Sequence, residues 1–92
     1  MQITLEYTAQ LRRAAGCRTE QMDVPEGCNL TQLLHVAADK HTPEFRNLLL
    51  MPTGERQPSL LLFLEDHQLL AGADPVLDAG ARVTIMSPIS GG

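Results

Sequence analysis

The strongest constraint on the fold is a helical pattern between residues 29 and 41. Asn29 stands at an N-cap position and Gln32 follows three residues later, which predicts a capping box. A helix with one apolar stripe must cover the face of another element, so the rest of the chain has to supply a surface for it. The stripe consists of Leu30, Leu33, Leu34, Ala37 and Ala38, at helical spacing.

Strands are predicted on both sides of this helix. Residues 2–8 alternate, with Ile3, Leu5 and Tyr7 on one side, and a period of two indicates a half-buried strand. The continuous leucine run at 59–64 suggests a strand that is covered on both faces. Further strands are expected over 18–24 (with Met22 and Val24 inward), from the turn at 65–67 to residue 70, and over 81–86.

Short helices and loops connect these strands. Residues 9–15 are good helix formers and Gly16 ends them. Thr42-Pro43-Glu44 predicts a new helix start with proline at its first position, and that helix is expected to reach Met51. The segment 52–58 reads as a polar loop, and 72–80 as a loop with one helical turn near Val76-Leu77.

The order of elements predicts an α+β fold. The first and last strands have the cleanest alternation, so we expect them side by side and parallel in the centre of a mixed sheet, with the main helix in the crossover. One long helix across one face of such a sheet is the β-grasp architecture of ubiquitin. The length predicts a single domain over residues 1–92.

The residues after the last predicted strand form an unusual ending. Ser87-Pro88-Ile89 cannot continue the strand, and the sequence closes with Ser90-Gly91-Gly92. Glycine has no Cβ, so a chain ending this way can pass through a channel that any side chain would block. We therefore expect residues 87–92 to be a thin tail that presents the Gly92 carboxylate as a reactive group, with Pro88, Ser90 and Gly91 threading it.

Composition excludes several other functions. The formal net charge is −4 and no basic patch occurs, which argues against nucleic acid as a partner. The longest apolar run is too short to cross a membrane, and the sequence shows no leader pattern. Two cysteines eleven positions apart match neither metal-ligand spacing nor a disulfide scaffold, so we expect a reducing, cytoplasmic location.

Other polar side chains are assigned structural roles. Cys17 is expected at a turn and Cys28 beside a helix start, with a persulfide relay and a pKa lowered by the helix N-terminus as the functional alternatives. His35 and His41 are six positions apart, so a helix would point them away from one another and they would not bind one metal ion together. Surface histidines and no metal are therefore predicted. No glycine-rich phosphate loop is present, so no bound cofactor is expected.

Two stretches at the ends of the chain carry a family resemblance. Tyr7-Thr8-Ala9-Gln10-Leu11-Arg12-Arg13-Ala14-Ala15-Gly16 resembles the opening of the small subunit of molybdopterin synthase. The final stretch 77–92, Leu-Asp-Ala-Gly-Ala-Arg-Val-Thr-Ile-Met-Ser-Pro-Ile-Ser-Gly-Gly, resembles the end of that same family. The wider group comprises the ubiquitin-like sulfur carriers, which also serve thiamine and cysteine synthesis.

This resemblance implies a function for the tail. An adenylating partner enzyme would use ATP to activate Gly92, and sulfur transfer would leave a thiocarboxylate there. The sulfur would then pass to an acceptor such as the large subunit of molybdopterin synthase, so this chain would be a carrier without its own active site. Docking is expected on the sheet face opposite the long helix, with Arg12-Arg13 as either a partner contact or a solvated helix face.

Three alternative functions remain open, two in which the tail is reactive and one in which it is inert. The acceptor could belong to cysteine or thiamine synthesis. The chain could instead be a ubiquitin-like modifier that is joined to lysines through Gly92. It could also be an interaction module with an inert tail, in which case removal of Gly91-Gly92 would change nothing.

Overall fold

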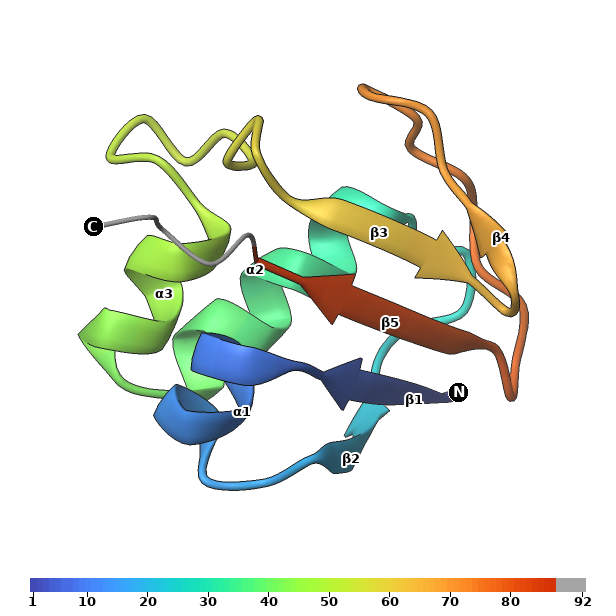
Figure 1. The fold of residues 1–92 in the computed structure, drawn as a ribbon. Coiled ribbons are helices and arrows are strands. Elements are labelled where there is room, and N and C mark those ends of the chain that lie inside the picture. The colour runs from blue at the N-terminus through green and yellow to red at the C-terminus, as the bar shows by residue number, and fades with distance from the viewer. Residues whose placement is uncertain (88–92) are drawn as a thin grey trace.

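The computed structural model describes residues 1–87, which form a mixed sheet with helices on one face. In these residues the elements are β1 (Gln2–Tyr7), α1 (Ala9–Ala15), β2 (Thr19–Asp23), α2 (Leu30–Lys40), α3 (Pro43–Leu49), β3 (Leu61–Leu64), β4 (His67–Gln68) and β5 (Arg82–Met86). The five strands lie in the order β2-β1-β5-β3-β4. Figure 1 shows α2 across one face of the sheet, with α1 and α3 together at one end.

Strands from opposite ends of the chain form the centre of the sheet. β1 and β5 pair in parallel, with Leu5 opposite Val83 and Tyr7 opposite Ile85. All four side chains are buried, so the centre of the sheet is also the centre of the core. α2 lies between these strands in sequence and provides the crossover that parallel pairing needs. The predicted α+β, β-grasp fold is therefore confirmed.

The main helix forms as its sequence predicts. The Asn29 side chain accepts a hydrogen bond from Gln32 N at 2.9 Å, and the Gln32 side chain accepts one from Asn29 N at 2.9 Å. These two bonds satisfy N–H groups that a helix start leaves without partners. All five residues of the predicted stripe are buried: Leu30, Leu33, Leu34, Ala37 and Ala38.

The two short helices close one end of the core. Gly16 ends α1 in the left-handed region, at φ +77°, and its N–H donates to Arg12 O at 3.0 Å. α3 begins at Pro43 as predicted, where Thr42 Oγ1 accepts from Phe45 N at 3.2 Å. Phe45 is fully buried, so α3 contributes an aromatic ring to the core.

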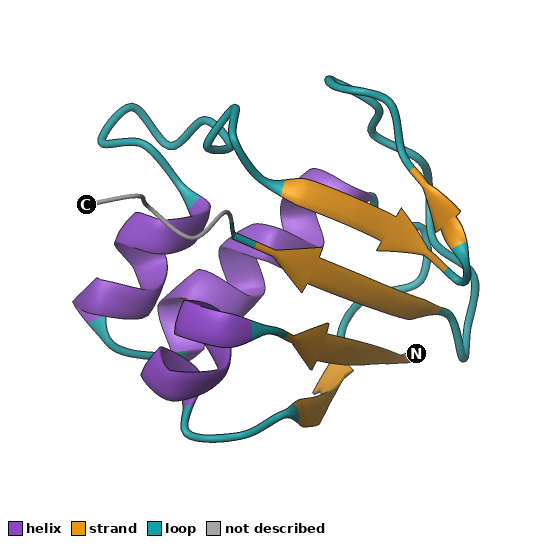
Figure 2. Cartoon of the chain, in the orientation of Figure 1, coloured by secondary structure: helices purple, strands orange, loops and turns teal. Residues whose placement is uncertain are grey.

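The structure corrects the predictions for the leucine run at 59–64 and for the segment 72–80. The leucine run is covered on one face only: Leu62 is 3% exposed, whereas Leu61 is 41% exposed. In the described residues the helices lie on one side of the sheet, so nothing covers the other face of β3 (Figure 2).

The segment 72–80 contains no helical turn either. Val76 instead forms an isolated bridge with Asn29, and Leu77 N donates to Cys28 O at 2.9 Å. This backbone pairing holds the segment extended beside the start of α2. Within residues 1–87, no helix is long and apolar enough to span a bilayer.

Candidate functional site

The residues predicted to carry the chemistry lie outside the described part of the chain. These are Pro88, Ser90, Gly91 and Gly92. The structure does describe the point from which they start, which is Ser87, directly after β5. β5 pairs with β1 on one side and with β3 on the other, and Thr8 Oγ1 donates to Ile85 O at 3.4 Å. The fold therefore holds the base of the predicted tail firmly at the end of its central strand.

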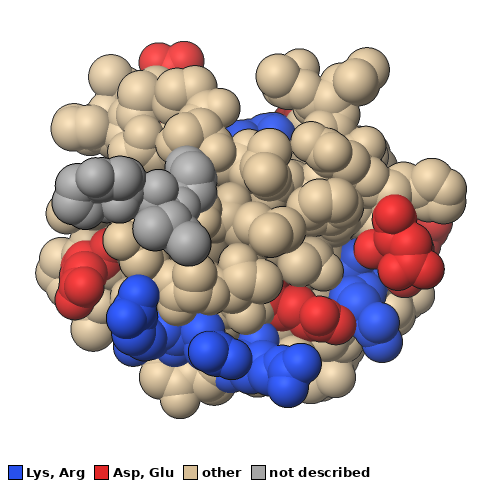
Figure 3. All heavy atoms as spheres, in the orientation of Figure 1, with Lys and Arg blue, Asp and Glu red and all other residues tan. Residues whose placement is uncertain are grey.

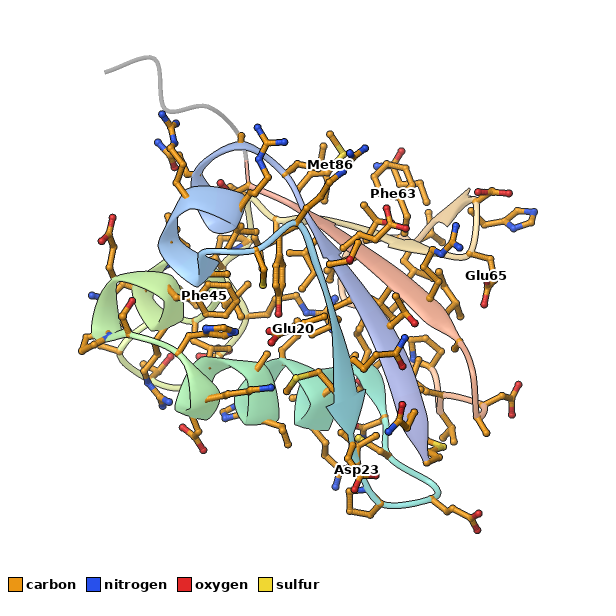
Figure 4. All side chains as sticks on the ribbon, turned by 90° about the horizontal axis from the view of Figure 1, so that it is seen from below. Glu20, Asp23, Phe45, Phe63, Glu65 and Met86 are labelled. Atoms are coloured by element: carbon orange, nitrogen blue, oxygen red, sulfur yellow. The ribbon has the colours of Figure 1, made fainter. Side chains whose placement is uncertain are left out.

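The sheet face opposite α2 carries a partly exposed apolar patch beside this base, in which Leu61 is exposed and Phe63 and Met86 are half-buried. It consists of Leu61 and Phe63 from β3 and Met86 from β5, and we call it the outer patch. Leu61 lies opposite Met86 in the ladder, and alternation along β3 and β5 places all three on the side away from the core. Figure 4 shows Phe63 and Met86 on the side of the sheet away from α2.

Charged side chains border the outer patch without occupying its centre. Arg82 Nε lies 3.2 Å from Glu6 Oε1 on the same face. Arg12 and Arg13 are exposed on α1, which follows β1 at the end of the sheet where β5 also terminates. Figure 3 shows the basic side chains along one margin of this face and an uncharged centre. An apolar centre with a polar rim is the usual anatomy of a protein-binding surface.

A second group of polar side chains lies on the opposite side of the sheet. Glu20 points inward from β2 and joins three elements. Its Oε1 accepts a hydrogen bond from the buried Tyr7 hydroxyl and lies 2.5 Å from His41 Nε2. Its Oε2 lies 3.3 Å from Lys40 Nζ. The Phe45 ring packs edge-on against Tyr7, with ring centroids 5.2 Å apart. We call Glu20, Tyr7, His41 and Lys40 the Glu20 cluster.

The protonation states of the Glu20 cluster follow from burial and hydrogen bonding. Burial alone raises the pKa of Glu20, but hydrogen bonds from Tyr7 and His41 stabilise the carboxylate, and its net pKa is lowered. Burial, followed by the hydrogen bond to Glu20, raises the pKa of Tyr7 strongly, so the hydroxyl remains a donor. At neutral pH the cluster therefore pairs a carboxylate anion with a protonated hydroxyl donor, which is a structural arrangement.

Sequence reasoning missed the Glu20 cluster, although a signal was present. Met22 and Val24 were predicted to point inward, and Glu20 has the same parity on that strand. An acid at an inward position needs partners, and these come from residues distant in sequence. His41 was predicted to be a surface histidine, but its side chain is only 13% exposed because it packs against Glu20.

The remaining predicted residues fall into structural roles. Cys28 is buried and its Sγ donates to Asn29 O at 3.3 Å, whereas Cys17 is half-buried. Burial raises the pKa of both thiols, so neither has the low pKa of a reactive cysteine. Among residues 1–87, no three His, Cys, Asp or Glu side chains gather as metal ligands.

The strand order and the helix across the sheet define a small ubiquitin-like fold of the β-grasp class. No protein-family model matches the sequence, and no curated protein matches it. Several solved structures do match. SAMP1 from Haloferax volcanii is 22% identical, with a TM-score of 0.86 over 100% of both chains.

Two further structures extend the comparison to other organisms. Urm1 from Trypanosoma brucei is 28% identical, with a TM-score of 0.78 over 99% of this chain and 95% of its own. A Pyrococcus furiosus protein, provisionally named molybdopterin converting factor, subunit 1, is 17% identical, with a TM-score of 0.73 over 97% and 99%. These neighbours confirm the resemblance to the ubiquitin-like sulfur-carrier proteins that the two ends of the sequence indicated.

Proposed function

We propose that this chain is a sulfur-carrier protein whose Gly92 is adenylated and then converted to a thiocarboxylate. The observation that carries the proposal is a ubiquitin-like fold shared with a protein named molybdopterin converting factor, subunit 1, combined with a sequence that continues beyond β5 as Ser-Pro-Ile-Ser-Gly-Gly. Neighbours of this kind are small carrier or modifier proteins without an active site of their own. The chain would accordingly act as a substrate and a subunit.

The chemistry belongs to Gly92 and to the partner enzymes. The carboxylate attacks the α-phosphate of ATP, and pyrophosphate leaves, which gives an acyl adenylate. A persulfide sulfur on a second protein then attacks the carbonyl carbon and displaces AMP. Cleavage of the resulting sulfur–sulfur bond by another thiol leaves the thiocarboxylate on Gly92 and a disulfide on the donor.

The described residues contribute docking and reach. Ordering the tail in a channel costs roughly 1–2 kcal/mol for each residue fixed, so part of the binding free energy has to come from the globular domain. The outer patch lies on β3 and β5, and β5 leads directly into the tail, so a partner that covers Leu61, Phe63 and Met86 sits beside the tail's base. Arg12 and Arg13 would contact an acidic margin of that partner.

We assign the acceptor to molybdopterin synthesis. The Pyrococcus furiosus neighbour supports this choice through its name, and the resemblance of residues 7–16 and 77–92 supports it independently. The proposal places the chain in the cytoplasm, as the small subunit of a molybdopterin synthase whose large subunit is the sulfur acceptor. A carrier for cysteine or thiamine synthesis uses the same tail with another acceptor.

A second candidate function is protein modification through Gly92. The observation that favours it is that several matching structures are named as small archaeal modifier proteins, from Haloferax volcanii and Methanosarcina acetivorans. The two functions share the adenylate and differ in what captures it. Sulfur capture gives a thiocarboxylate, whereas an amine gives an isopeptide.

The activation step is tested by replacing Gly91 with tryptophan. The activating enzyme is first purified from the protein's own cell by its ATP–pyrophosphate exchange in the presence of this chain. We expect wild type to support exchange and Gly91→Trp to abolish it, with an unchanged circular dichroism spectrum. Exchange at the wild-type rate with Gly91→Trp would contradict the narrow-channel argument.

A further inference from the structure

Lysine usage in this chain is extreme. The sequence holds six arginines but a single lysine, Lys40, so it offers one side-chain amine in 92 residues. Guanidinium groups stay protonated and do not accept acyl groups near neutral pH. The Met1 α-amine donates to Val24 O at 2.7 Å and lies 3.6 Å from Asp23 Oδ1. Lys40 is therefore the one side chain in this sequence that offers a primary amine to an acyl group.

Lys40 also occupies a defined position. It is the last residue of α2, its side chain is 53% exposed, and its Nζ lies 3.3 Å from Glu20 Oε2. Glu20 is itself held by Tyr7 and His41 and is only 13% exposed, so it is a fixed partner. The ammonium group is thus placed at one point on the surface, and the ion pair is weak enough at this exposure to open.

Lys40 lies on the helix layer and the outer patch lies on the opposite sheet face. Glu20 projects between β2 and α2 in Figure 4, whereas Phe63 and Met86 lie on the other side of the sheet. An enzyme that covers the outer patch and receives the tail of one copy therefore leaves that copy's Lys40 uncovered. A chain of this design can be an acyl donor through one face and an acyl acceptor through the other.

We propose that Lys40 is the acceptor site for the activated C-terminal glycine of a second copy of this chain. This inference rests on the modifier function proposed above, and it specifies a single linkage, Gly92 to Lys40. The amine nitrogen of Lys40 attacks the carbonyl carbon of the acyl adenylate. Before the attack the ammonium group gives one proton to water and becomes the neutral amine. The bond from the carbonyl carbon to the AMP oxygen then breaks, AMP leaves, the nitrogen gives a second proton to water, and an isopeptide N–H remains.

The fold tolerates this reaction. Acylation removes one positive charge near Glu20, but the carboxylate keeps its contacts with Tyr7 and His41. Lys40 is at the helix terminus and half its side chain faces solvent, so an attached chain meets no buried surface.

Peptide mapping tests the linkage. An epitope-tagged chain is recovered under denaturing conditions from its own cell and digested with trypsin, which cleaves after Arg18, Arg46 and Arg82 but not after an acylated lysine. We expect a branched peptide in which residues 83–92 are attached to Lys40 of residues 19–46. Lys40→Arg keeps the charge and the Glu20 contact, and it should remove the branched peptide completely.

A matched control tests whether the position matters. Arg46 is 43% exposed and pairs with Asp39 at 2.7 Å, but Asp39 is itself 73% exposed and has no such fixed surroundings. Arg46→Lys therefore adds a competing amine of similar exposure. We expect the branch to remain on Lys40, and equal labelling of both positions would overturn the positional assignment.

The outcomes separate this inference from the proposed function. A thiocarboxylate on Gly92 without a branch on Lys40 would overturn the inference and leave the carrier function standing. Branches of residues 83–92 on other proteins, and none on Lys40, would overturn it and leave the modifier function standing. Absence of both products would overturn the inference together with the proposed function.

Discussion

Substitutions in the Glu20 cluster should lower the stability of the fold more than substitutions of its other polar side chains. Glu20→Ala leaves the Tyr7 hydroxyl, in a residue 2% exposed, without its acceptor. An unpaired buried hydroxyl costs about 1–3 kcal/mol, and loss of the His41 contact adds to this. The exposed Lys40 pair contributes little. We expect a destabilisation of about 2–3 kcal/mol, which corresponds to a fall in Tm of about 10–20 °C for a domain of this size.

A double-mutant cycle isolates the Tyr7–Glu20 bond. Tyr7→Phe removes the donor and retains the ring that packs on Phe45, so it should cost about 1–2 kcal/mol. In the Tyr7→Phe background, Glu20→Ala leaves no hydroxyl without an acceptor. The double variant should therefore be more stable, by about 1–2 kcal/mol, than the summed destabilisations of the two single variants predict. The chain has no tryptophan and one tyrosine, so urea unfolding at pH 7 is followed by far-UV circular dichroism.

The pH dependence gives an independent check. The folded chain holds the pKa of Glu20 below its ordinary value of 4.5, so the stabilisation is present in full above that value. It disappears as the pH falls through the lowered pKa, because the carboxylate then becomes protonated. The gap between wild type and Glu20→Ala should therefore shrink in acid. A gap below about 0.5 kcal/mol at pH 7, or additive effects in the cycle, would refute this account of Glu20.

Three further predictions follow from the same structure. The raised pKa of Tyr7 means that the unfolded chain ionises first, so stability should fall as the pH rises above the ordinary value of 10.0. Tyr7→Phe should reduce that slope in urea titrations and leave the smaller part that comes from the raised pKa values of Cys17 and Cys28. Leu61→Asp in the outer patch should raise the KM for the chain in ATP–pyrophosphate exchange by about tenfold or more. The control Leu70→Asp, at a position 83% exposed and outside the patch, should leave the KM unchanged. Equal effects of the two substitutions would exclude the outer patch as the docking surface. Asn29→Ala removes the capping box of α2 and should cost about 0.5–2 kcal/mol in thermal unfolding, and an unchanged Tm would show that the cap is not stabilising.

Local patterns in the sequence were sufficient for the helices and the central strands. The capping box, the apolar stripe of α2 and the stop at Gly16 depend on neighbours within one or two helical turns, so the sequence contains all the information they need. The parallel pairing of β1 and β5 followed from two clean alternations and one crossover helix. That step succeeded because few topologies accommodate these elements.

Long-range contacts could not be predicted in the same way. Glu20 meets His41 across 21 residues of sequence, and no spacing rule connects them. The leucine run led us to expect that Leu61 is covered. That expectation failed because a leucine run does not show how many layers a fold has, and in residues 1–87 no second layer covers Leu61. The predicted site at Pro88, Ser90, Gly91 and Gly92 lies outside the described residues, so it stays a prediction.

The central claim is that Gly92 carries sulfur, and the intact mass of the native protein tests it most directly. The chain is purified from its own cell without reducing agents that exchange sulfur, and its C-terminal peptide 83–92 is fragmented. We expect a population in which one oxygen of the Gly92 carboxylate is replaced by sulfur, and we expect this population to be lost when Gly92 is deleted. An unmodified carboxylate on Gly92 in every copy of the chain would contradict the sulfur-carrier function. This holds also for chains purified from cells in which use of the sulfur is blocked.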